Sequence, residues 1–494
     1  MSQPDANPLS LLLHQPEGKT LEFKRDLSSP RPLLKTLVAF ANSAGGKLVI
    51  GMTDDKQLIG VENPLDEEER LCSLIADSIT PRLVPEIELV TLEQVTLLVV
   101  EVYPSNARPH WLTGEGAQQG VYVRLGSTNR RADPELIGEL VRSVVGGAFD
   151  EIAMPALSVD AIDRVALRQA FGDKRLLDEQ ALLTLKLITP DQGRLVPTRG
   201  GILLFGKERL RHFSDAWVQC GRFFGSEKID IFDHADINAP LPQAVDEVML
   251  FLKKHAYRSA DLSEVRRKDV WSIPLAMLRE GIINALVHSD YSQRGAPIRV
   301  VFLDDRIEIE SPGILLPGLT IEEIKRGTSR IRNHVIARVF RELNLIEQWG
   351  TGVRRIFAEA NAQGLPEPRI EEVGMRLRLT IYLASEHRIT PKRGSQPQGL
   401  ESRLESGLES LTERILGYLQ TTPLAKSELA KALGHNSISS TLNLRVNELL
   451  EQQYIERTIP DKPNSRLQKY RLTEKGEKML TAKNTKETKE KNHE

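Results

Sequence analysis

Three polar residues in the middle of the chain are spaced as a binding site on a helix would require. Glu280, Asn284 and His288 are four residues apart within "EGIINALVHSDY", among residues that are otherwise apolar or Gly up to His288. On a helix, positions i, i+4 and i+8 fall on one face. An amide oxygen can bind Mg²⁺, and a carboxylate can orient a water molecule. The spacing therefore predicts a helix face on which Asn284 binds Mg²⁺ and Glu280 activates water, with His288 beside them.

Two glycine-containing turns follow this helix and could bring the backbone close to a nucleotide. The residues expected to contact the cofactor there are Ser311, Gly313 and Gly318 in "ESPGILLPG", and Gly350, Thr351 and Gly352 in "QWGTGVRR". The second turn precedes an expected helix, whose free N–H groups and dipole would favour a phosphate. ATP can therefore bind here without a phosphate-binding loop of the P-loop type.

One other stretch, "GILLFGKE" from Gly201 to Glu208, matches most of a P-loop motif. Glu208 stands where that motif needs a Ser or Thr for magnesium, and the four residues between the glycines are all apolar. A phosphate cradle needs exposed backbone N–H groups. The stretch is therefore predicted to be a buried core strand that ends in a turn.

The order of polar helix, hairpin, glycine box and second glycine box resembles the GHKL ATPase superfamily of gyrase, Hsp90, histidine kinases and MutL. "LREGIINALVHSDYSQRGAPIRV" and "RIRNHVIARVFRELNLIEQWGTGVRRI" are most similar to its divergent RecG-like branch, found in prokaryotic proteins described as predicted transcriptional regulators. The resemblance implies a GHKL-like α/β sandwich over residues 150–385 that binds ATP and Mg²⁺. Ser311 stands where the superfamily usually has an Asp that hydrogen-bonds adenine, so a domain that has lost ATP is the alternative.

The N-terminal part resembles a different family. "EGKTLEFKRD", "LVAFANSAGGKLVIGMTDDKQLIGV" and "GVYVRLGSTNRRAD" are similar to the Schlafen-type AlbA-2 domain, which is associated with nucleic-acid binding and is expected at residues 1–145. Some members cleave RNA with two glutamates five residues apart and a later aspartate, and Glu17, Glu22 and Asp54 are the matching nuclease centre. Alternatively, Glu22 and Lys24, which share one face of a strand, form a structural pair.

Basic and polar residues at both ends of the chain are candidates for nucleic-acid contacts, because phosphate contacts come mainly from Lys and Arg. In the N-terminal domain the candidates are Lys24, Arg25, Arg124, Arg130 and Arg131. Residues 412–478 predict three helices and a hairpin, the pattern of a winged helix-turn-helix. Its candidates are Ser440, Asn443, Arg445 and Lys469. A winged helix that binds protein is the alternative.

Composition limits the remaining possibilities. The 494 residues carry a net charge of -2 and only two cysteines, Cys72 and Cys220, which disfavours a disulfide scaffold and a zinc site. No segment has the length of a membrane span and no signal peptide is recognisable, so the protein is expected to be cytoplasmic without a membrane partner. Residues 386–411 are expected to be a linker whose LESx repeats form a partly helical spacer or an oligomerising helix. Residues 479–494 are expected to be a disordered charged tail.

The expected fold is therefore multidomain α+β, with an AlbA-2-like α/β domain, a GHKL-like α/β sandwich and a C-terminal winged helix. The expected function is that of an ATP-responsive DNA-binding transcriptional regulator, in which nucleotide binding gates the flanking domains. RNA is a possible partner, and a homodimer or larger homo-oligomer is implied by the GHKL resemblance. The alternatives are a metal-dependent nuclease serving phage defence and a non-enzymatic interaction scaffold.

Overall fold

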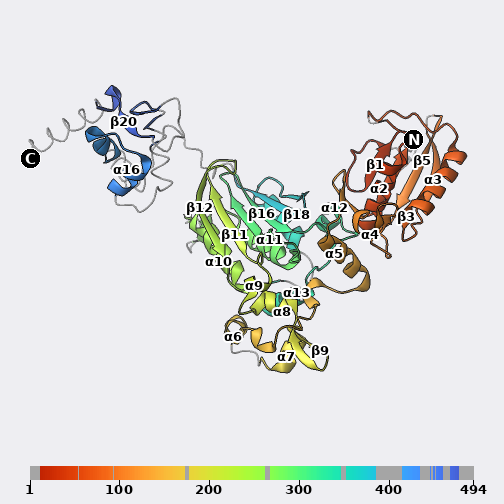
Figure 1. Ribbon diagram of the computed structural model, residues 1–494, viewed down its shortest axis with the longest axis horizontal. Coiled ribbons are helices and arrows are strands. Elements are labelled where there is room, and N and C mark those ends of the chain that lie inside the picture. Colours follow the sequence, from red (N-terminus) through yellow and green to blue (C-terminus); the bar gives the residue numbers. More distant parts are fainter. Residues whose placement is uncertain are drawn as a thin grey trace, which may run out of the picture. The chain divides into compact units, whose positions relative to one another are not determined.

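The structure is a computed structural model, and it divides into two compact units, Met1–Thr390 and Pro391–Glu494 (Figure 1). The residues that the structure describes are 12–53, 55–92, 94–172, 177–256, 258–261, 268–346, 352–384, 414–433, 446, 449–450, 452–459 and 468–477. None of the helices formed by these residues has the length and apolar content needed to cross a bilayer.

The N-terminal domain is built on a four-stranded sheet with strand order β1-β2-β5-β4. Its strands are β1 (Leu21–Lys24), β2 (Gly46–Ile50), β3 (Ile79–Thr80), β4 (Glu86–Leu92), β5 (Val95–Val102), β6 (Trp111–Leu112), β7 (Tyr122–Leu125) and β8 (Thr128–Arg131). Its helices are α2 (Pro30–Asn42), α3 (Pro64–Ser78), α4 (Gly116–Gln119) and α5 (Pro134–Val145). β1 and β2 are parallel, whereas the pairs β2/β5 and β4/β5 are antiparallel. This mixed α/β domain confirms the fold expected for the first part of the chain.

A small helical region follows α5 and leads into the middle domain. Its elements are η1 (Phe149–Glu151), η2 (Val159–Ala161), α6 (Arg164–Phe171), α7 (Glu179–Thr184), β9 (Ile188–Asp191), β10 (Arg194–Pro197), α8 (Arg199–Phe205) and α9 (Arg209–His212). The carboxylate of Asp150 accepts hydrogen bonds from the backbone N–H groups of His334, Val335 and Ile336, at 2.7–3.0 Å. It thereby caps the first turn of α13 (His334–Glu342).

The strand predicted at Gly201–Glu208 is wrong, because α8 covers most of this stretch. The Thr198 hydroxyl caps the helix by accepting a hydrogen bond from the Gly201 N–H at 2.9 Å. Every residue from 200 to 205 is buried. A short apolar run that is buried on all sides has the same composition in a helix and in a strand, so periodicity could not separate them. The exclusion of a P-loop is unaffected, since these backbone groups do not face solvent.

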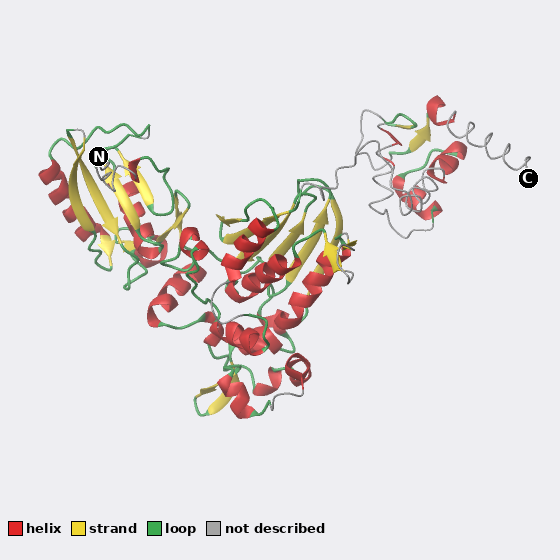
Figure 2. Cartoon of the chain, turned by 180° about the vertical axis from the view of Figure 1, so that it is seen from behind, coloured by secondary structure: helices red, strands yellow, loops and turns green. Residues whose placement is uncertain are grey.

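The middle domain centres on a six-stranded sheet with strand order β12-β11-β15-β16-β18-β17. Its strands are β11 (Val218–Phe223), β12 (Ile231–Ile237), β15 (Ile298–Phe302), β16 (Arg306–Pro312), β17 (Arg369–Val373) and β18 (Arg376–Tyr382), and a separate hairpin joins β13 (Arg258–Asp261) to β14 (Lys268–Trp271). The helices are α10 (Leu241–Lys254), α11 (Leu275–His288), α12 (Ile321–Lys325), α13 and α14 (Gly352–Ala362). α10 and α11 pack against the sheet and form a helical layer on it (Figures 1 and 2). The hairpin predicted after the polar helix is confirmed as β15–β16, which turns at Asp304 and Asp305.

Helix α11 carries the predicted polar stripe in the predicted orientation. Its Met277, Leu278, Gly281, Ile282, Ile283, Ala285, Leu286 and Val287 are buried. Glu280, Asn284 and His288 are only partly buried. A Cβ on Gly281 would lie 2.8 Å from side-chain carbons of Ile309 and Leu379. Gly281 therefore lets α11 approach β16 and β18 closely, which fixes the height of the polar stripe above the sheet.

The C-terminal unit has a small apolar core of its own, formed by Ile415, Leu416, Leu419, Leu429, Leu433, Val446, Leu449, Ile455 and Tyr470. Residues 414–421 are helical, as is α16 (Lys426–Ala432). β19 (Ile455–Arg457) pairs antiparallel with β20 (Tyr470–Leu472). These elements agree with the first two helices and the hairpin that the sequence predicts. The third predicted helix and the hairpin turn lie largely or wholly outside the described residues, so the winged helix stays a prediction.

Candidate functional site

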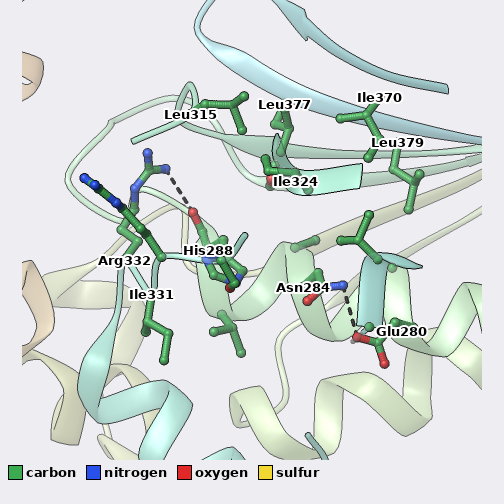
Figure 3. A pocket seen from close by; sticks show the side chains of 18 of the residues that line it. Glu280, Asn284, His288, Leu315, Ile324, Ile331, Arg332, Ile370, Leu377 and Leu379 are labelled. Atoms are coloured by element: carbon green, nitrogen blue, oxygen red, sulfur yellow. Dashed lines mark hydrogen bonds between the residues drawn. The ribbon is translucent and has the colours of Figure 1, made fainter. Parts of the chain in front are cut away.

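The polar face of α11 opens into a cavity of about 490 Å³ in the middle domain (Figure 3). The elements around it are α11, β16, the loop 313–319, the segment 327–332, helices α12, α13 and α14, and strands β17 and β18. Six of the residues predicted from sequence line this cavity: Glu280, Asn284, His288, Ser311, Gly313 and Gly352. Residues more than seventy positions apart in the chain are thus brought to one site. A cavity of this size is typical of sites for small ligands and cofactors.

Both oxygens of the Glu280 carboxylate have hydrogen-bond partners. Oε1 accepts from Asn284 Nδ2 at 3.2 Å, and Oε2 accepts from Arg355 at 2.9 Å. Figure 3 shows the Asn284 amide pointing along the helix toward Glu280. Because the amide nitrogen is engaged in this way, the Asn284 oxygen is the atom left to act as a ligand. Glu280 is held in place on the cavity wall, as a residue that orients water must be.

Gly352 is the first residue of α14, and it lies against the Glu280 carboxylate. A Cβ at this position would come within 1.8 Å of Glu280 Oε1, so glycine leaves room for the carboxylate in its present position. An anionic group at a helix N-terminus is stabilised by the free N–H groups and the helix dipole. The carboxylate therefore lies in the same electrostatic environment that was expected for a phosphate. The predicted Gly350 and Thr351 lie outside the described residues.

His288 is electrically neutral in this site. Desolvation, helped by the positive charge of Arg332, lowers the pKa of His288 to about 4. Arg332 also donates a hydrogen bond to the backbone oxygen of His288 at 2.9 Å (Figure 3). At neutral pH the ring can therefore donate or accept a hydrogen bond inside the cavity but adds no charge to it.

Four arginines line the cavity, and the sequence had given them no role. They are Arg330, Arg332, Arg341 and Arg355, whereas Glu280 is the only acidic residue among the described residues that line it. Arginine is suited to binding phosphate and carboxylate because its planar guanidinium group can donate two parallel hydrogen bonds. The cavity thus has the charge expected for an anionic ligand. The R-I-R sequence at 330–332, directly after a Gly-Thr-Ser turn, was the signal that could have identified two of these residues.

The opposite wall of the cavity is apolar. It is formed by Ile309, Ile324, Ile370, Leu377 and Leu379, four of which are labelled in Figure 3. A flat ring could be buried against these side chains while its charged substituent reaches the arginines. The cavity therefore combines an apolar side with a cationic side, which is the arrangement that a nucleotide requires.

The first glycine box is tightly packed. Ser311 is 5% exposed and lies in β16 opposite Leu377 of β18. Gly313 has φ +102°, and a Cβ on it would lie 2.0 Å from an Arg332 nitrogen, so this position requires glycine. Gly318, which was also predicted to contact the cofactor, is absent from the cavity wall. It lies against the guanidinium group of Arg330, which does line the cavity.

The N-terminal glutamates are used by the fold itself. Glu17 accepts a hydrogen bond from the Phe23 N–H at 2.9 Å. Glu22, 7% exposed, forms ion pairs with both Lys24 and Arg124. The structure thus agrees with the structural-pair alternative for Glu22 and Lys24. Asp54 lies outside the described residues. Within the described part of the chain, no group of three or more His, Cys, Asp or Glu side chains is placed to hold a metal ion.

The predicted phosphate contacts of this domain divide into two groups. Arg124 is 1% exposed, and its guanidinium group donates to the backbone oxygen of Gly18 at 3.1 Å and to Asn129 at 2.9 Å. It cannot reach a phosphate, because it is buried among these partners and Glu22. Arg25, Arg130 and Arg131 are exposed and remain candidates for nucleic-acid contacts. Sequence could not separate the two groups, since β7 is almost wholly buried and β8 is largely exposed, and both strands carry arginine.

Two further basic residues lie beside Arg131 and were missed. Arg31 forms an ion pair with Glu115 at 2.7 Å, and Lys35 lies 4.8 Å above the centre of the Tyr122 ring. Arg131 lies 3.9 Å from the same Glu115. Helix α2 and the β7–β8 hairpin thus gather three cations near Glu115, whose carboxylate also accepts a hydrogen bond from the buried Tyr122 hydroxyl.

Of the residues predicted to contact nucleic acid in the C-terminal unit, Lys469 is among those that the structure describes. Its ammonium group lies 3.3 Å from the carboxylate of Glu428, and both side chains are nearly half exposed. Its neighbour Arg471 is similarly paired with Glu456 at 2.6 Å. Ser440, Asn443 and Arg445 lie outside the described residues.

Comparisons with protein families agree with two of the domains. Residues 17–133 match the model "Schlafen, AlbA_2", and residues 295–381 match the model "Putative ATP-dependent DNA helicase recG C-terminal". Residues 412–473 match the model "Filamentation induced by cAMP protein Fic-like, C-terminal domain". The matched regions agree with the resemblances identified from sequence for the first two domains. They leave the winged helix unconfirmed.

Solved structures offer weaker likenesses. The DIP2311 protein from Corynebacterium diphtheriae is 18% identical over 92% of this chain and 95% of its own, with a TM-score of 0.39. The N-terminal domain of a RecG-related protein from Nitrosomonas europaea is 28% identical over 25% of this chain and 90% of its own, with a TM-score of 0.21. Because both TM-scores are low, these superpositions carry no conclusion. No curated protein matches the chain significantly.

Proposed function

We propose that this chain, which carries a Schlafen AlbA_2 domain and a recG C-terminal type of ATPase-like domain, is a nucleotide-responsive, DNA-binding regulator of transcription. ATP with Mg²⁺ is the ligand proposed for the middle domain, and nucleic acid is the partner proposed for the N-terminal domain. The observation that carries the proposal is the cavity beside α11, with its cationic wall, its apolar wall and its polar helix face.

The charges of the cavity favour a nucleotide over a neutral ligand. Arg355 is paired with Glu280 and Arg332 with Glu139, so Arg330 and Arg341 supply the surplus positive charge that a triphosphate would neutralise. The apolar residues of β16, β17 and β18 would cover the base. Ser311, which stands in place of an Asp, can offer a hydroxyl group to the base but no charge, so discrimination between bases is expected to be modest.

The donor set fits a magnesium ion only when the nucleotide supplies further oxygens. Asn284 would hold the ion through its side-chain oxygen, because its nitrogen is bonded to Glu280. The ion would neutralise charge on the phosphates. Glu280, fixed by Arg355 and Asn284, would orient a water molecule on the same helix face.

The nucleotide assignment is tested by equilibrium binding of fluorescent ATP to the full-length chain with and without Mg²⁺. Asn284→Ala is expected to weaken binding about tenfold and to remove most of the Mg²⁺ dependence, because it deletes the amide ligand. Asn361→Ala, on an exposed position of α14, is the matched control and is expected to bind like the wild type. Equal affinities of wild type and Asn284→Ala would reject the site.

The nucleic-acid assignment is tested by titrating DNA and RNA oligonucleotides at several salt concentrations. Replacing Arg25, Arg130 and Arg131 by Ala is expected to weaken binding and to flatten the slope of log K against log salt by about one unit per lost phosphate contact. Arg168→Ala, an exposed change in the middle domain, should leave the slope unaltered. Absence of binding to either nucleic acid at low salt would reject this part of the proposal.

A further inference from the structure

The loop 313–319 contributes side chains both to the cavity of the middle domain and to an apolar cluster of the N-terminal domain. Its Gly313, Ile314, Leu315, Leu316 and Leu319 line the cavity of the middle domain. The Ile314 side chain is 7% exposed and is also part of an apolar cluster with Val121, Val123, Ala132, Leu136 and Leu140 of the N-terminal domain. A displacement of this loop by a ligand would therefore disturb the N-terminal core, because close-packed interiors transmit strain.

A first polar connection reaches the loop through Leu315. The Leu315 N–H donates to Glu372 Oε1 at 2.8 Å, and the same carboxylate accepts from Lys19 at 2.7 Å. The Lys19 and Glu372 side chains are only 13% and 4% exposed. Lys19 comes from the segment just before β1, so the N-terminal domain helps to fix the carboxylate that holds the loop backbone.

A second polar connection reaches the loop through Ile314. Arg332 donates to the backbone oxygen of Ile314, and its Nε lies 2.7 Å from the carboxylate of Glu139 in α5. The contact with Glu139 is an ion pair without the geometry of a hydrogen bond. Both side chains are less than 10% exposed, which makes the pair sensitive to small displacements. Arg332 lines the cavity, whereas Glu139 is not among the residues that line it.

The far end of the loop makes a third connection. The backbone N–H of Gly318 donates to the backbone oxygen of Ser43 at 3.0 Å. The Ser43 hydroxyl in turn accepts a hydrogen bond from the backbone N–H of Arg124 at 2.9 Å. Ser43 follows helix α2, and Arg124 lies in β7. These two elements carry the Lys35–Tyr122 contact described above, so the loop is tied to the part of the N-terminal domain where cations gather.

We propose that the loop 313–319 couples the nucleotide cavity to nucleic-acid binding by the N-terminal domain, with Glu139 and Lys19 as positioning residues. The inference rests on the proposed function and names the route by which it is regulated. A nucleotide that contacts Arg332 or the loop changes the two ion pairs and the packing of Ile314. By linkage, nucleic acid must then change nucleotide affinity by the same factor.

The test measures nucleic-acid affinity of the full-length chain with no nucleotide and with saturating Mg²⁺-ATP. The wild type is expected to show a change of about tenfold, a usual magnitude for coupling between two sites. Glu139→Gln and Lys19→Met are each expected to reduce this change to about twofold or less, while both ligands still bind. Glu135→Gln is the matched control, because Glu135 is exposed one turn earlier on α5.

The outcomes separate this inference from the proposed function. Failure of ATP to bind the wild type would overturn both. Binding of both ligands with independent affinities, or undiminished coupling in Glu139→Gln and Lys19→Met, would overturn the coupling route alone. A double-mutant cycle of Glu139→Gln and Arg332→Gln in urea unfolding tests the physical link without any ligand. Additive effects in that cycle would also overturn it.

Discussion

The cavity of the middle domain and the buried core of the N-terminal domain each contain a glutamate paired with an arginine. Only the first of these ion pairs borders space that a ligand could occupy. Glu280 is paired with Arg355 at the edge of a cavity of about 490 Å³. Glu22 is paired with Arg124, which is 1% exposed and has its donors committed to the fold. In the first case the charges border open space, and in the second they are packed among protein atoms.

The difference shows why residue types alone do not identify a site. A buried ion pair whose partners are all satisfied holds elements together, and it leaves nothing for a ligand to bind. A pair beside a cavity with surplus cations keeps donors available for an anion. The following predictions test this contrast, in order of decreasing effect.

Removal of Arg124 should have the largest effect and should act on stability. Arg124→Ala leaves the carboxylate of Glu22 buried without its main partner, which is expected to cost about 3–5 kcal/mol of unfolding free energy. Urea unfolding of the full chain, followed by a probe in the N-terminal domain, measures this. Arg131→Ala, an exposed change on the adjacent strand, should alter stability by less than about 0.5 kcal/mol. A stable Arg124→Ala protein that no longer binds nucleic acid would show that the Glu22–Arg124 pair belongs to a binding site and is not needed for the fold.

Lowering the pH should change the contributions of His288 and Asp150 to folding stability in opposite directions. The pKa of His288 is lowered to about 4, so the unfolded chain takes up a proton first and this residue reduces stability as pH falls from about 6.5 to 4. Burial raises the pKa of Asp150 to about 6, so this residue adds stability as pH falls from about 6 toward its unfolded value near 4.

Each effect can be isolated by removing one titrating group. His288→Gln should become more stable relative to wild type as pH is lowered from 7 to 4.5, by up to about 1.4 kcal/mol per pH unit. Asp150→Asn should show the opposite trend over the same range. Thermal melting of both variants and the wild type across this range is the measurement. Parallel curves for His288→Gln and wild type would show that the ring is charged in the folded cavity.

Loss of Arg355 should affect ligand binding more than stability. The Arg355 side chain is 46% exposed, so its ion pair with Glu280 is worth at most about 1 kcal/mol to the fold. Arg355→Ala should nevertheless weaken ATP binding about tenfold, since a charge-assisted contact to an anion contributes about 1.5–3 kcal/mol. Isothermal titration and thermal melting of the same preparation separate the two effects. A large loss of stability with unchanged ATP affinity would show that the Glu280–Arg355 pair serves the fold, as the Glu22–Arg124 pair does.

The smallest effect is expected at Lys469. Its ion pair with Glu428 joins side chains that are 45% and 46% exposed, so Lys469→Ala should change stability by about 0.5 kcal/mol or less. If Lys469 contacts DNA, the same variant should still lower duplex affinity and its salt dependence. Glu428→Ala, which frees Lys469, should then raise duplex affinity. Unchanged affinity in both variants would remove this lysine from the proposed nucleic-acid surface.

Local patterns were sufficient wherever a segment had only one way to bury its apolar side chains. The spacing in α11 predicted its polar stripe, because the apolar residues between the polar ones must face the sheet. At Gly201–Glu208 the pattern failed, because a run of apolar residues that is buried on all sides carries no periodicity. The exposed and buried arginines of the β7–β8 hairpin look alike in sequence, since pairing with α2 and β1 decides which of them is covered.

By itself, the sequence determined the order of the first two domains, the α+β class and the face of α11 that carries Glu280, Asn284 and His288. These follow from side-chain periodicity and from motifs that are contiguous in the chain. Only the tertiary structure decided that four arginines join this face, that Arg124 is buried, and that the loop 313–319 is packed into the N-terminal domain. Those contacts join residues up to several hundred positions apart, and their energies depend on burial and distance, which no local pattern encodes.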